Sequence, residues 1–423
     1  MSSQVRPDLP ASDTVTEAPS VPRLPRPRAG VAFGVVAAAI TLALAASGTP
    51  SPLYVDYQAR WHFSATTLTA VYAMYAGGVI ITLLFAGGLS DRVGRRPVLL
   101  GSVLALIASL VMFLCATSIA WLYAARLLQG LATGVFTGAA GAALTELHPR
   151  RDGGIAAVVY SMSTSIGTAA GAVIAGALAQ WVPWPLRTPF LLLMVVAIVV
   201  LAGIALWVPE TVPRRRKVRL RALIQSRRIT VPPHMRKQFV IGCLGVVAAW
   251  SVGGLYLALG GSLAKELLHV DNHLVAGLVI LTVQGVGGVI PLAFTRVSGR
   301  IASAMGCVAL IVGMGVVVLA VLLPNAPLFL VGDVVTGVGF GLAFMGGTRI
   351  VTQASPEDKR GQVLAAFFVV AYLAISVPAI GAGMIATHIG LERTFYLFAG
   401  ITSAFALVTT VRTMAWREDD PHA

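Results

Sequence analysis

The sequence predicts an all-α membrane protein with twelve transmembrane helices arranged in two pseudo-symmetric six-helix bundles. Hydrophobic residues make up 57% of the chain and charged residues only 11%, whereas soluble domains carry about 25% charged residues. The hydrophobic residues also gather in runs of about 20 residues, the length that a helix needs to cross a bilayer. A third observation, the placement of Lys and Arg, gives the orientation of these helices.

Twelve apolar runs follow one another along the chain, separated by short polar breaks. They cover residues 30–47, 66–87, 98–117, 120–144, 155–179, 188–207, 239–263, 274–294, 301–323, 328–348, 363–386 and 394–411. The first run is long for the apolar segment of a signal peptide, so we interpret it as a retained helix. The pattern predicts a disordered cytoplasmic tail at 1–29, a first bundle at 30–208, a basic linker at 209–237, a second bundle at 238–414 and a short cytoplasmic tail at 415–423.

Lys and Arg residues fall unequally on the two sides of the predicted membrane. One side, which carries both termini, holds 26 of the 31 basic residues, and the other side holds only Arg60, Arg187, Lys265 and Arg393. Cytoplasmic loops collect basic residues, so both termini are predicted to be cytoplasmic, in the inner or plasma membrane of the cell. The net charge of +14 is thus a topology signal, with anionic lipid near the linker, and does not indicate nucleic-acid binding.

The loop after the second run has a specific spacing of glycine, acid and arginine. Residues 87–97 read Gly-Gly-Leu-Ser-Asp-Arg-Val-Gly-Arg-Arg-Pro. Gly94 permits a sharp backbone turn, and Asp91 can accept hydrogen bonds from arginines or a helix N-terminus. The pattern resembles the signature loop between helices two and three of the major facilitator superfamily (MFS). This resemblance implies the MFS fold over almost the whole chain after the tail. It also implies a gating loop that locks the two halves in the outward-facing state, formed here by Gly87, Asp91, Arg92, Gly94, Arg95 and Arg96.

The fourth run contains a charged residue, Arg126. Arg126, Gln129, Gly130 and Gly134 fall on one face of a helix. A charge inside the bilayer is costly, so Arg126 is expected to face a cavity or a partner, unless its side chain extends to the outer interface. The stretch resembles the fourth-helix motif of proton-coupled members of the family, which implies a part for Arg126 in proton coupling.

The fifth run contains Gly167, Gly171 and Gly176. Drug–proton antiporters of the family carry a glycine- and proline-rich motif here, and this chain matches it only in part, because Ala172 follows Gly171. Close packing of small residues between helices explains these glycines equally well.

The tenth run contains an acid, Asp333, with apolar neighbours on both sides. An ionisable residue within a membrane helix is a functional hypothesis by default. If the two bundles are repeats, Asp333 aligns with Arg126 and Gly337 with Gly130. Asp333 is therefore our candidate for binding and releasing a proton; the alternatives are a structural ion pair and a helix end at the outer interface. The loop at 296–300 resembles a copy of the gating loop without its acid.

Aromatic and uncharged residues supply the candidates for a substrate cavity. They are Tyr72, Tyr75, Trp250, Tyr256, Gln284, Phe344 and Tyr372. Polar groups in the middle of the runs are few, which favours an apolar or amphipathic solute and hence efflux of drug-like or natural-product compounds. The energy source implied is the proton gradient, and no cofactor is expected.

Other function classes fit the sequence less well, although the same fold also suits a proton-coupled importer of a small metabolite. An enzyme needs paired carboxylates, a metal cluster or a nucleophile with its base, and the runs offer none of these. Cys115, Cys243 and Cys307 lie too far apart in sequence for metal-ligand spacing. The gating loop argues against a receptor or a channel. We therefore expect a monomeric drug/proton antiporter-type transporter that binds no metal and whose partners are a small-molecule substrate, protons and the lipid bilayer.

Overall fold

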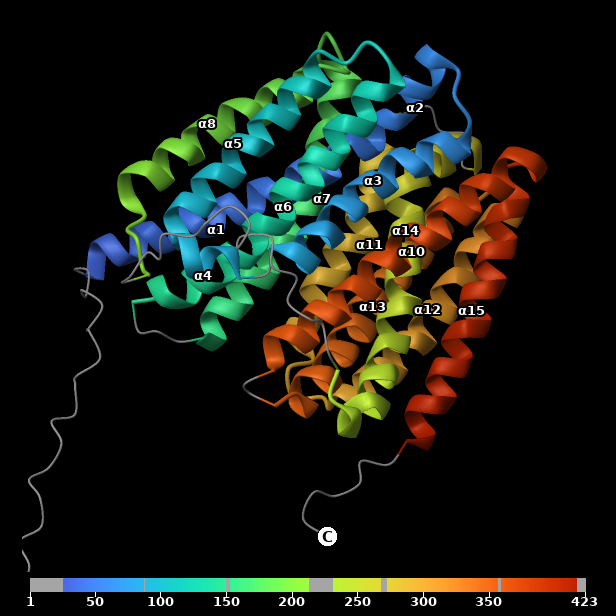
Figure 1. The fold of residues 1–423 in the computed structure, drawn as a ribbon. Helices are drawn as coiled ribbons and strands as arrows, with labels where there is room; N and C mark the ends of the chain where they lie inside the picture. The colour runs from blue at the N-terminus through green and yellow to red at the C-terminus, as the bar shows by residue number, and fades with distance from the viewer. Residues whose placement is uncertain are drawn as a thin grey trace, which may run out of the picture.

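The structure is a computed structural model that describes residues 26–86, 88–149, 153–212, 231–267, 272–356 and 359–416. The regular elements in these ranges are helices (Figure 1). They are α1 (Arg26–Gly48), α2 (Pro50–Trp61), α3 (Ala65–Phe85), α4 (Leu89–Val93), α5 (Arg95–Leu114), α6 (Ile119–Leu147), α7 (Gly153–Trp181), α8 (Thr188–Trp207), the short η1 (Pro233–Met235), α10 (Arg236–Leu267), α11 (His273–Ala293), α12 (Gly299–Leu322), α13 (Ala326–Ala354), α14 (Arg360–Ile389) and α15 (Leu391–Ala415). Twelve helical segments of this described part are long and apolar enough to cross a membrane, which confirms the predicted fold class.

The first span differs from the prediction because it continues past a proline break. α1 ends at Gly48, and α2 continues from Pro50 to Trp61, whereas the predicted span stops before the break. Proline is tolerated in the first turn of a helix, where its missing N–H has no helical partner to lose. His62, with a φ of 50°, ends α2 in the left-handed conformation. α1 also includes residues 26–29, which were assigned to the tail; most of that predicted tail and of the linker lies outside the described residues.

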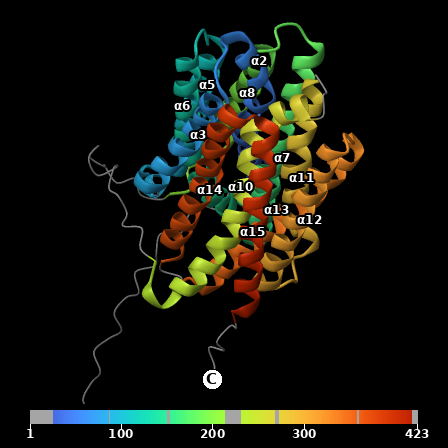
Figure 2. The same cartoon turned by 90° about the vertical axis from the view of Figure 1, so that its right-hand side faces the viewer.

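The helices pack as two halves, α1–α8 and α10–α15 (Figure 1). Helices α2, α3 and α7 of the first half contact helices α10, α11 and α14 of the second half. In both views, α2 and the last turn of α15 lie at opposite ends of the molecule (Figures 1 and 2). We call the end with α2 the closed end and the end with residues 88–97 the loop end.

At the closed end the two halves meet in direct contact. The hydroxyl oxygens of Thr66 and Thr387 lie 3.0 Å apart, and the Thr66 hydroxyl donates to the carbonyl oxygen of Gly383 at 3.2 Å. A Cβ atom added to Gly277 would lie 2.7 Å from the carbonyl oxygen of Ala172. The backbones of helices from the two halves therefore lie so close here that no side chain fits between them.

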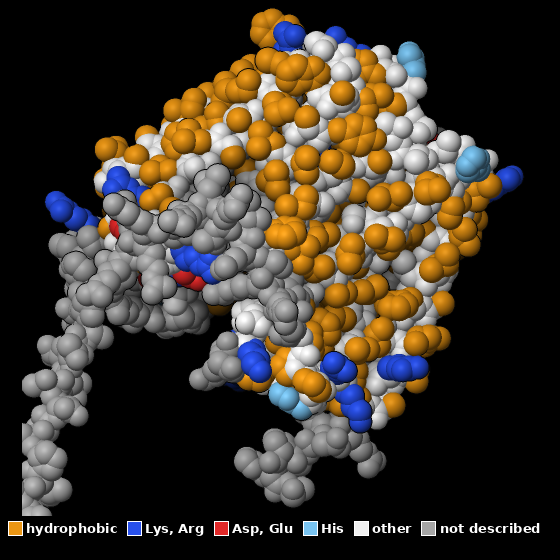
Figure 3. Space-filling model, in the orientation of Figure 1, with side chains coloured by type: hydrophobic (Ala, Val, Ile, Leu, Met, Phe, Trp, Pro, Cys, Tyr) orange, Lys and Arg blue, Asp and Glu red, His pale blue; other side chains and the backbone are white. Residues whose placement is uncertain are grey.

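The outer surface suits lipid better than water. Hydrophobic side chains cover much of the face in Figure 3, and the Lys and Arg side chains lie mainly toward its margins. Leu206, Val199 and Val411 are 73%, 66% and 59% exposed. Apolar exposure on this scale exceeds what soluble monomers show, which agrees with a multi-pass membrane protein.

Candidate functional site

The predicted gating loop forms a polar cluster within the first half, at the loop end. Arg95, the first residue of α5, pairs with Asp91, donates to Ser90 at 2.6 Å and donates to Glu146 on α6 at 3.2 Å. The backbone N–H of Arg95 donates to the Glu210 carboxylate at 2.8 Å, and an acid at the N-terminus of a helix also suits the helix dipole. Asp91 is thus paired within its own half in this conformation.

Gly94 makes the turn of this loop possible. Its φ is +112°, and a Cβ atom there would lie 2.2 Å from Oε2 of Glu210, so only glycine fits without strain. Arg96 donates to the carbonyl oxygen of Ala205 near the end of α8. Arg92 is half-buried on the last turn of α4, and Gly87 lies outside the described residues.

The second half repeats the arginine contact without the acid. Arg300, at the start of α12, donates to the carbonyl oxygens of Thr413 at 3.1 Å and of Met414 at the end of α15. This contact is the counterpart of Arg96 at the end of α8, and in both places a cation meets the carbonyl end of a helix. The loop at 296–300 therefore supports helix ends.

Arg126 is fully buried inside the first half, so its side chain does not extend to the outer interface. Its guanidinium donates to the Tyr54 hydroxyl at 2.7 Å, to Oε1 of Gln129 at 2.7 Å and to the carbonyl oxygen of Ser47 at 2.9 Å. Three tyrosine rings also surround it, with centroids 5.5–5.6 Å away, within cation–π range: Tyr54, Tyr72 and Tyr75. No carboxylate of the described residues forms an ion pair with Arg126.

Arg126 and Gln129 together bridge the proline break of the first span. Pro50 has no N–H, so the carbonyl group of Ala46 lacks its usual helical donor. Nε2 of Gln129 donates to this carbonyl oxygen at 2.8 Å, and Nη1 of Arg126 donates to the next carbonyl oxygen along the chain, that of Ser47. The fourth-helix motif thus satisfies backbone groups next to the break. Pro50, directly after an apolar run, is the one signal of this break in the sequence, and no role was predicted for it.

The glycines of the fourth-helix motif let α6 lie close to α3. A Cβ atom on Gly130 would lie 2.1 Å from the carbonyl oxygen of Tyr75, and one on Gly134 would lie 1.9 Å from the Thr82 hydroxyl. Gly337 also brings α13 close to α11, where a Cβ atom would lie 2.8 Å from the carbonyl oxygen of Thr282. The expected correspondence of Gly130 and Gly337 agrees with these contacts.

The glycines of α7 have a packing explanation. Cβ atoms on Gly167 and Gly171 would lie 2.4 and 2.1 Å from carbonyl oxygens of α1. One on Gly176 would lie 2.3 Å from the carbonyl oxygen of His273, in the other half. Close helix packing is therefore sufficient to explain all three.

Asp333 is fully buried on α13 and contacts Tyr256 of α10. The Tyr256 hydroxyl donates to Oδ1 of Asp333 at 2.7 Å, while Oδ2 has no hydrogen-bond partner. No Lys or Arg of the described residues pairs with this acid. Both alternatives considered for Asp333, an ion pair and a helix end at the interface, therefore differ from what the structure shows.

The pairs Tyr54–Arg126 and Tyr256–Asp333 occupy matching places in the two halves. Each joins the first span of its half to the fourth, and each charged residue stands four positions before its motif glycine. Tyr54 was missed in the sequence, because an isolated tyrosine in a span looks like ordinary core. Only an alignment of the first spans of both halves would have revealed it.

Three of the predicted cavity residues gather in the second half. The Trp250 ring lies 5.4 Å from Phe344 and 5.2 Å from Tyr372, between centroids. Phe367 and Phe368 extend this aromatic cluster, each 6.4 Å from Phe344. The Trp250 indole N–H has no hydrogen-bond partner. Aromatic surroundings with a few available polar atoms are typical of small-molecule sites.

The aromatic cluster continues into the first half through two tyrosines. The hydroxyl groups of Tyr75 and Tyr372 interact across the halves, and Tyr72 and Tyr75 flank Arg126. Two of the predicted cavity residues lie elsewhere. Tyr256 is fully buried against Asp333, and Gln284 is half-buried on α11 with an unpartnered Oε1.

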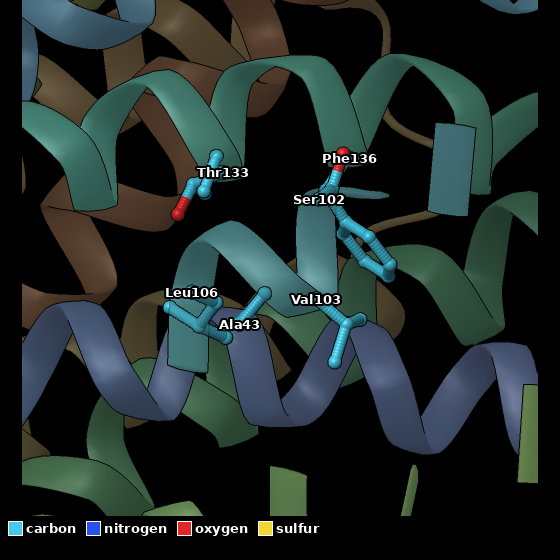
Figure 4. A pocket seen from close by; sticks show the side chains of 7 residues that line it. Ala43, Ser102, Val103, Leu106, Thr133 and Phe136 are labelled. Carbon is cyan, nitrogen blue, oxygen red and sulfur yellow. The ribbon is translucent and has the colours of Figure 1, made fainter. Parts of the chain in front are cut away.

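A small hollow lies inside the first half, between α1, α5 and α6 (Figure 4). Its lining residues are Ala43, Ser102, Val103, Leu106, Ala132, Thr133 and Phe136. The free volume is about 10 Å³, which is about the space of one water molecule. The hollow is therefore a packing gap and not a substrate site.

Several known transporters resemble this chain over part of its length. The gentisate transporter of Corynebacterium glutamicum is 35% identical over 118 residues, 27% of this chain and 26% of that protein. Multidrug resistance protein D of Escherichia coli is 34% identical over 134 residues, 31% and 33% of the two chains. The multidrug transporter MdfA of Yersinia pestis is 32% identical over 146 residues, 34% of each chain. The matched segments thus span only a quarter to a third of these relatives.

Solved transporter structures share the fold over nearly the whole chain. A bacterial homologue of the human lysosomal transporter Spinster, in an inward-facing and unoccupied conformation, superposes with a TM-score of 0.74 at 14% identity, covering 93% of this chain and 100% of that one. The nucleoside transporter NupG gives a TM-score of 0.70 at 11% identity, covering 92% and 100%. Identities this low concern the fold alone.

The family description "Major Facilitator Superfamily" matches residues 31–377. This range is most of the chain, and the twelve apolar helices and the transporter fold agree with it. The protein is accordingly a transporter and not an enzyme. As the pattern of residues 87–97 predicted, the chain belongs to the major facilitator superfamily.

Proposed function

We propose that this protein is a secondary active transporter that couples proton movement to the efflux of hydrophobic or amphipathic, drug-like or natural-product solutes. Asp333 is the main support for this proposal, because it is fully buried and Tyr256 is its one hydrogen-bond donor among the described residues. An ionised carboxylate has room for about four hydrogen bonds, and burying one without them costs several kcal/mol. The protonation of Asp333 therefore depends on how much water each conformation admits, which is what a coupling site requires.

The aromatic cluster supports the substrate class. Trp250, Phe344 and Tyr372 offer apolar ring surface, and Tyr72 and Tyr75 continue it into the first half. The unpartnered indole N–H of Trp250 provides a polar contact without a charge. Relatives named as multidrug transporters agree with such a solute.

The transport cycle we propose is rocker-switch alternating access between residues 30–208 and 238–414, in a monomer. In this proposal both termini face the cytoplasm, so the closed end, where the halves touch, faces outward. Asp91 now pairs with Arg95 in its own half. When the loop end closes, Asp91 contacts the second half and locks the outward-facing state.

Purified protein in proteoliposomes tests the coupling. An imposed proton gradient should drive a lipophilic dye against its concentration gradient. Asp333→Asn, which keeps the size of the side chain, should abolish this uphill flux and spare dye exchange without a gradient. Gradient-driven accumulation that persists in Asp333→Asn would exclude the acid as the coupling site.

A second candidate function is proton-coupled import of a small metabolite. Arg126 has no carboxylate partner among the described residues, and one relative is a gentisate transporter. The same vesicles decide between the two functions, because an importer moves solute in the direction of the proton and an exporter moves it in the opposite direction.

A further inference from the structure

A histidine at the closed end joins the two halves through both of its ring nitrogens. His273, the first residue of α11, places Nε2 2.9 Å from Oδ1 of Asp56 on α2. Its Nδ1 lies 3.3 Å from Oε1 of Gln180 near the end of α7, and its backbone N–H donates to the same oxygen at 3.0 Å. His273 belongs to the second half, and both partners belong to the first. We call these three residues the clasp.

The clasp offers an acceptor atom to each ring nitrogen. The backbone N–H of His273 requires an acceptor, so the atom of Gln180 that it meets is the amide oxygen and not the NH₂ group. The other ring nitrogen meets the carboxylate of Asp56. A neutral imidazole carries one N–H and can serve only one of the two acceptors, whereas the imidazolium carries an N–H on both nitrogens. The geometry therefore matches the protonated ring.

Asp56 is the acid placed to pair with this cation. At the closed end, the described elements packed around α11 bring Asp56, Tyr57 and Arg60 on α2 and Lys265 and Glu266 on α10. Farther along the same elements lie Tyr54 on α2, Tyr160 on α7, Arg236, Lys237, Cys243 and Tyr256 on α10, and Asp333 and Arg349 on α13. α7 carries none in its last turn, and α11 carries none besides His273. Lys265 and Glu266 are exposed at the end of α10. Asp56 and His273 keep 27% and 24% of their side chains exposed, so protons from bulk water reach the pair.

We propose that the clasp is a second proton-binding site, complete only while the two halves touch at the closed end. When the halves separate, His273 moves away from Asp56 and Gln180 together, and the two acceptor atoms that match its imidazolium form are lost. A ligand that binds one of two conformations more tightly shifts the equilibrium toward it. The proton is this ligand here, so acid stabilises the closed end, and the stabilisation is lost as the pH rises.

Only one step of this inference rests on the proposed function, namely that the closed end faces outward. With that orientation, external acid favours the conformation that collects solute from the cytoplasm. The contact between the halves and the binding of the proton do not depend on the orientation, on the substrate or on Asp333.

Pulsed EPR on the purified full-length protein in lipid nanodiscs tests the proposal. Spin labels at Ala59→Cys on α2 and Glu266→Cys on α10, both exposed, report the distance between the halves. The three native cysteines, Cys115, Cys243 and Cys307, are replaced by alanine in this background. Between about pH 5 and about pH 8, the ratio of closed to open protein should fall by up to about tenfold per pH unit, the limit for one coupled proton.

Variants locate the proton. His273→Gln should remove the pH dependence, and Asp56→Asn should do the same if the first variant fails to fold. His388→Gln is the matched control, because this histidine is exposed on the last turn of α14 at the same end, and it should keep the pH dependence. The proposal is overturned if the fraction of closed protein does not change with pH in the unmodified protein. It is also overturned if this fraction still depends on pH in His273→Gln.

A separate variant distinguishes the clasp from the coupling site. Asp333→Asn should lose proton-driven transport and retain pH-dependent closure. If transport proves independent of the proton gradient while His273→Gln still abolishes pH-dependent closure, the proposed coupling fails and the clasp stands.

Discussion

Replacing Gln129 with leucine should destabilise the folded protein by about 2–4 kcal/mol. The change keeps the approximate size of the side chain and removes two hydrogen bonds, one to the Ala46 carbonyl at 2.8 Å and one from Arg126 at 2.7 Å. Because Pro50 has no N–H, the Ala46 carbonyl is left without a donor. An unsatisfied buried acceptor costs about 1–3 kcal/mol, and a lost bond between membrane helices adds about 0.6–1.7 kcal/mol.

Unfolding in mixed micelles with increasing SDS, followed by circular dichroism, measures this loss. Gln129→Glu separates the two bonds, because it keeps the acceptor for Arg126 and loses the donor to Ala46. Ser109→Ala is the control, since its buried hydroxyl has no hydrogen-bond partner and its removal should be nearly neutral. A Gln129→Leu variant within about 0.5 kcal/mol of the unmodified protein, the range of an ordinary surface substitution, would refute the idea that Gln129 supports the proline break.

Three further substitutions test the packing and the gating loop. Gly130→Ala should lower the yield of monodisperse protein in size-exclusion chromatography, because a Cβ atom would lie 2.1 Å from a carbonyl oxygen of α3; Gly101→Ala, with nothing within 4 Å, should not. Gly94→Ala should destabilise the protein by about 1–3 kcal/mol because its φ is +112°, and an unchanged melting temperature would contradict this. Asp91→Asn should impair transport with membrane insertion intact, and unchanged flux would remove its gating role.

The twelve spans were predictable because each apolar run can be recognised from the hydropathy of its own residues, without knowledge of its contacts with other helices. The continuation of the first span was not, since Pro50, Pro52 and Asp56 end the apolar run while the helix goes on. The Arg126 and Gln129 side chains bond to the carbonyl groups beside this break. Contacts from another helix, α6, therefore stabilise the helix across a stretch whose own residues predict its end. Such contacts cannot be read from the hydropathy of the stretch itself.

The candidate functional residues divide in the same way, into those visible within one run and those defined by contacts between distant parts of the chain. Arg126 and Asp333 were found because a single charge in an apolar run is conspicuous. Their partners Tyr54 and Tyr256 stand 72 and 77 residues away; Tyr54 was missed, and Tyr256 was predicted as a cavity residue and not as the partner of Asp333. The clasp went unnoticed because His273 lies 217 residues from Asp56, at the end of a run, where a polar residue is ordinary.

The two buried charges differ in how well the protein satisfies them, and this difference favours different roles. Arg126 has an unpartnered Nη2, but it makes three hydrogen bonds and faces three tyrosine rings, and an arginine stays charged at any physiological pH. It can therefore support a helix or steer a proton electrostatically, but it cannot carry one. Asp333, at the matching place, accepts one hydrogen bond and has an unpartnered oxygen, and a carboxyl group can change its charge. We therefore propose that proton exchange belongs to Asp333 and that Arg126 contributes by holding the first span in place.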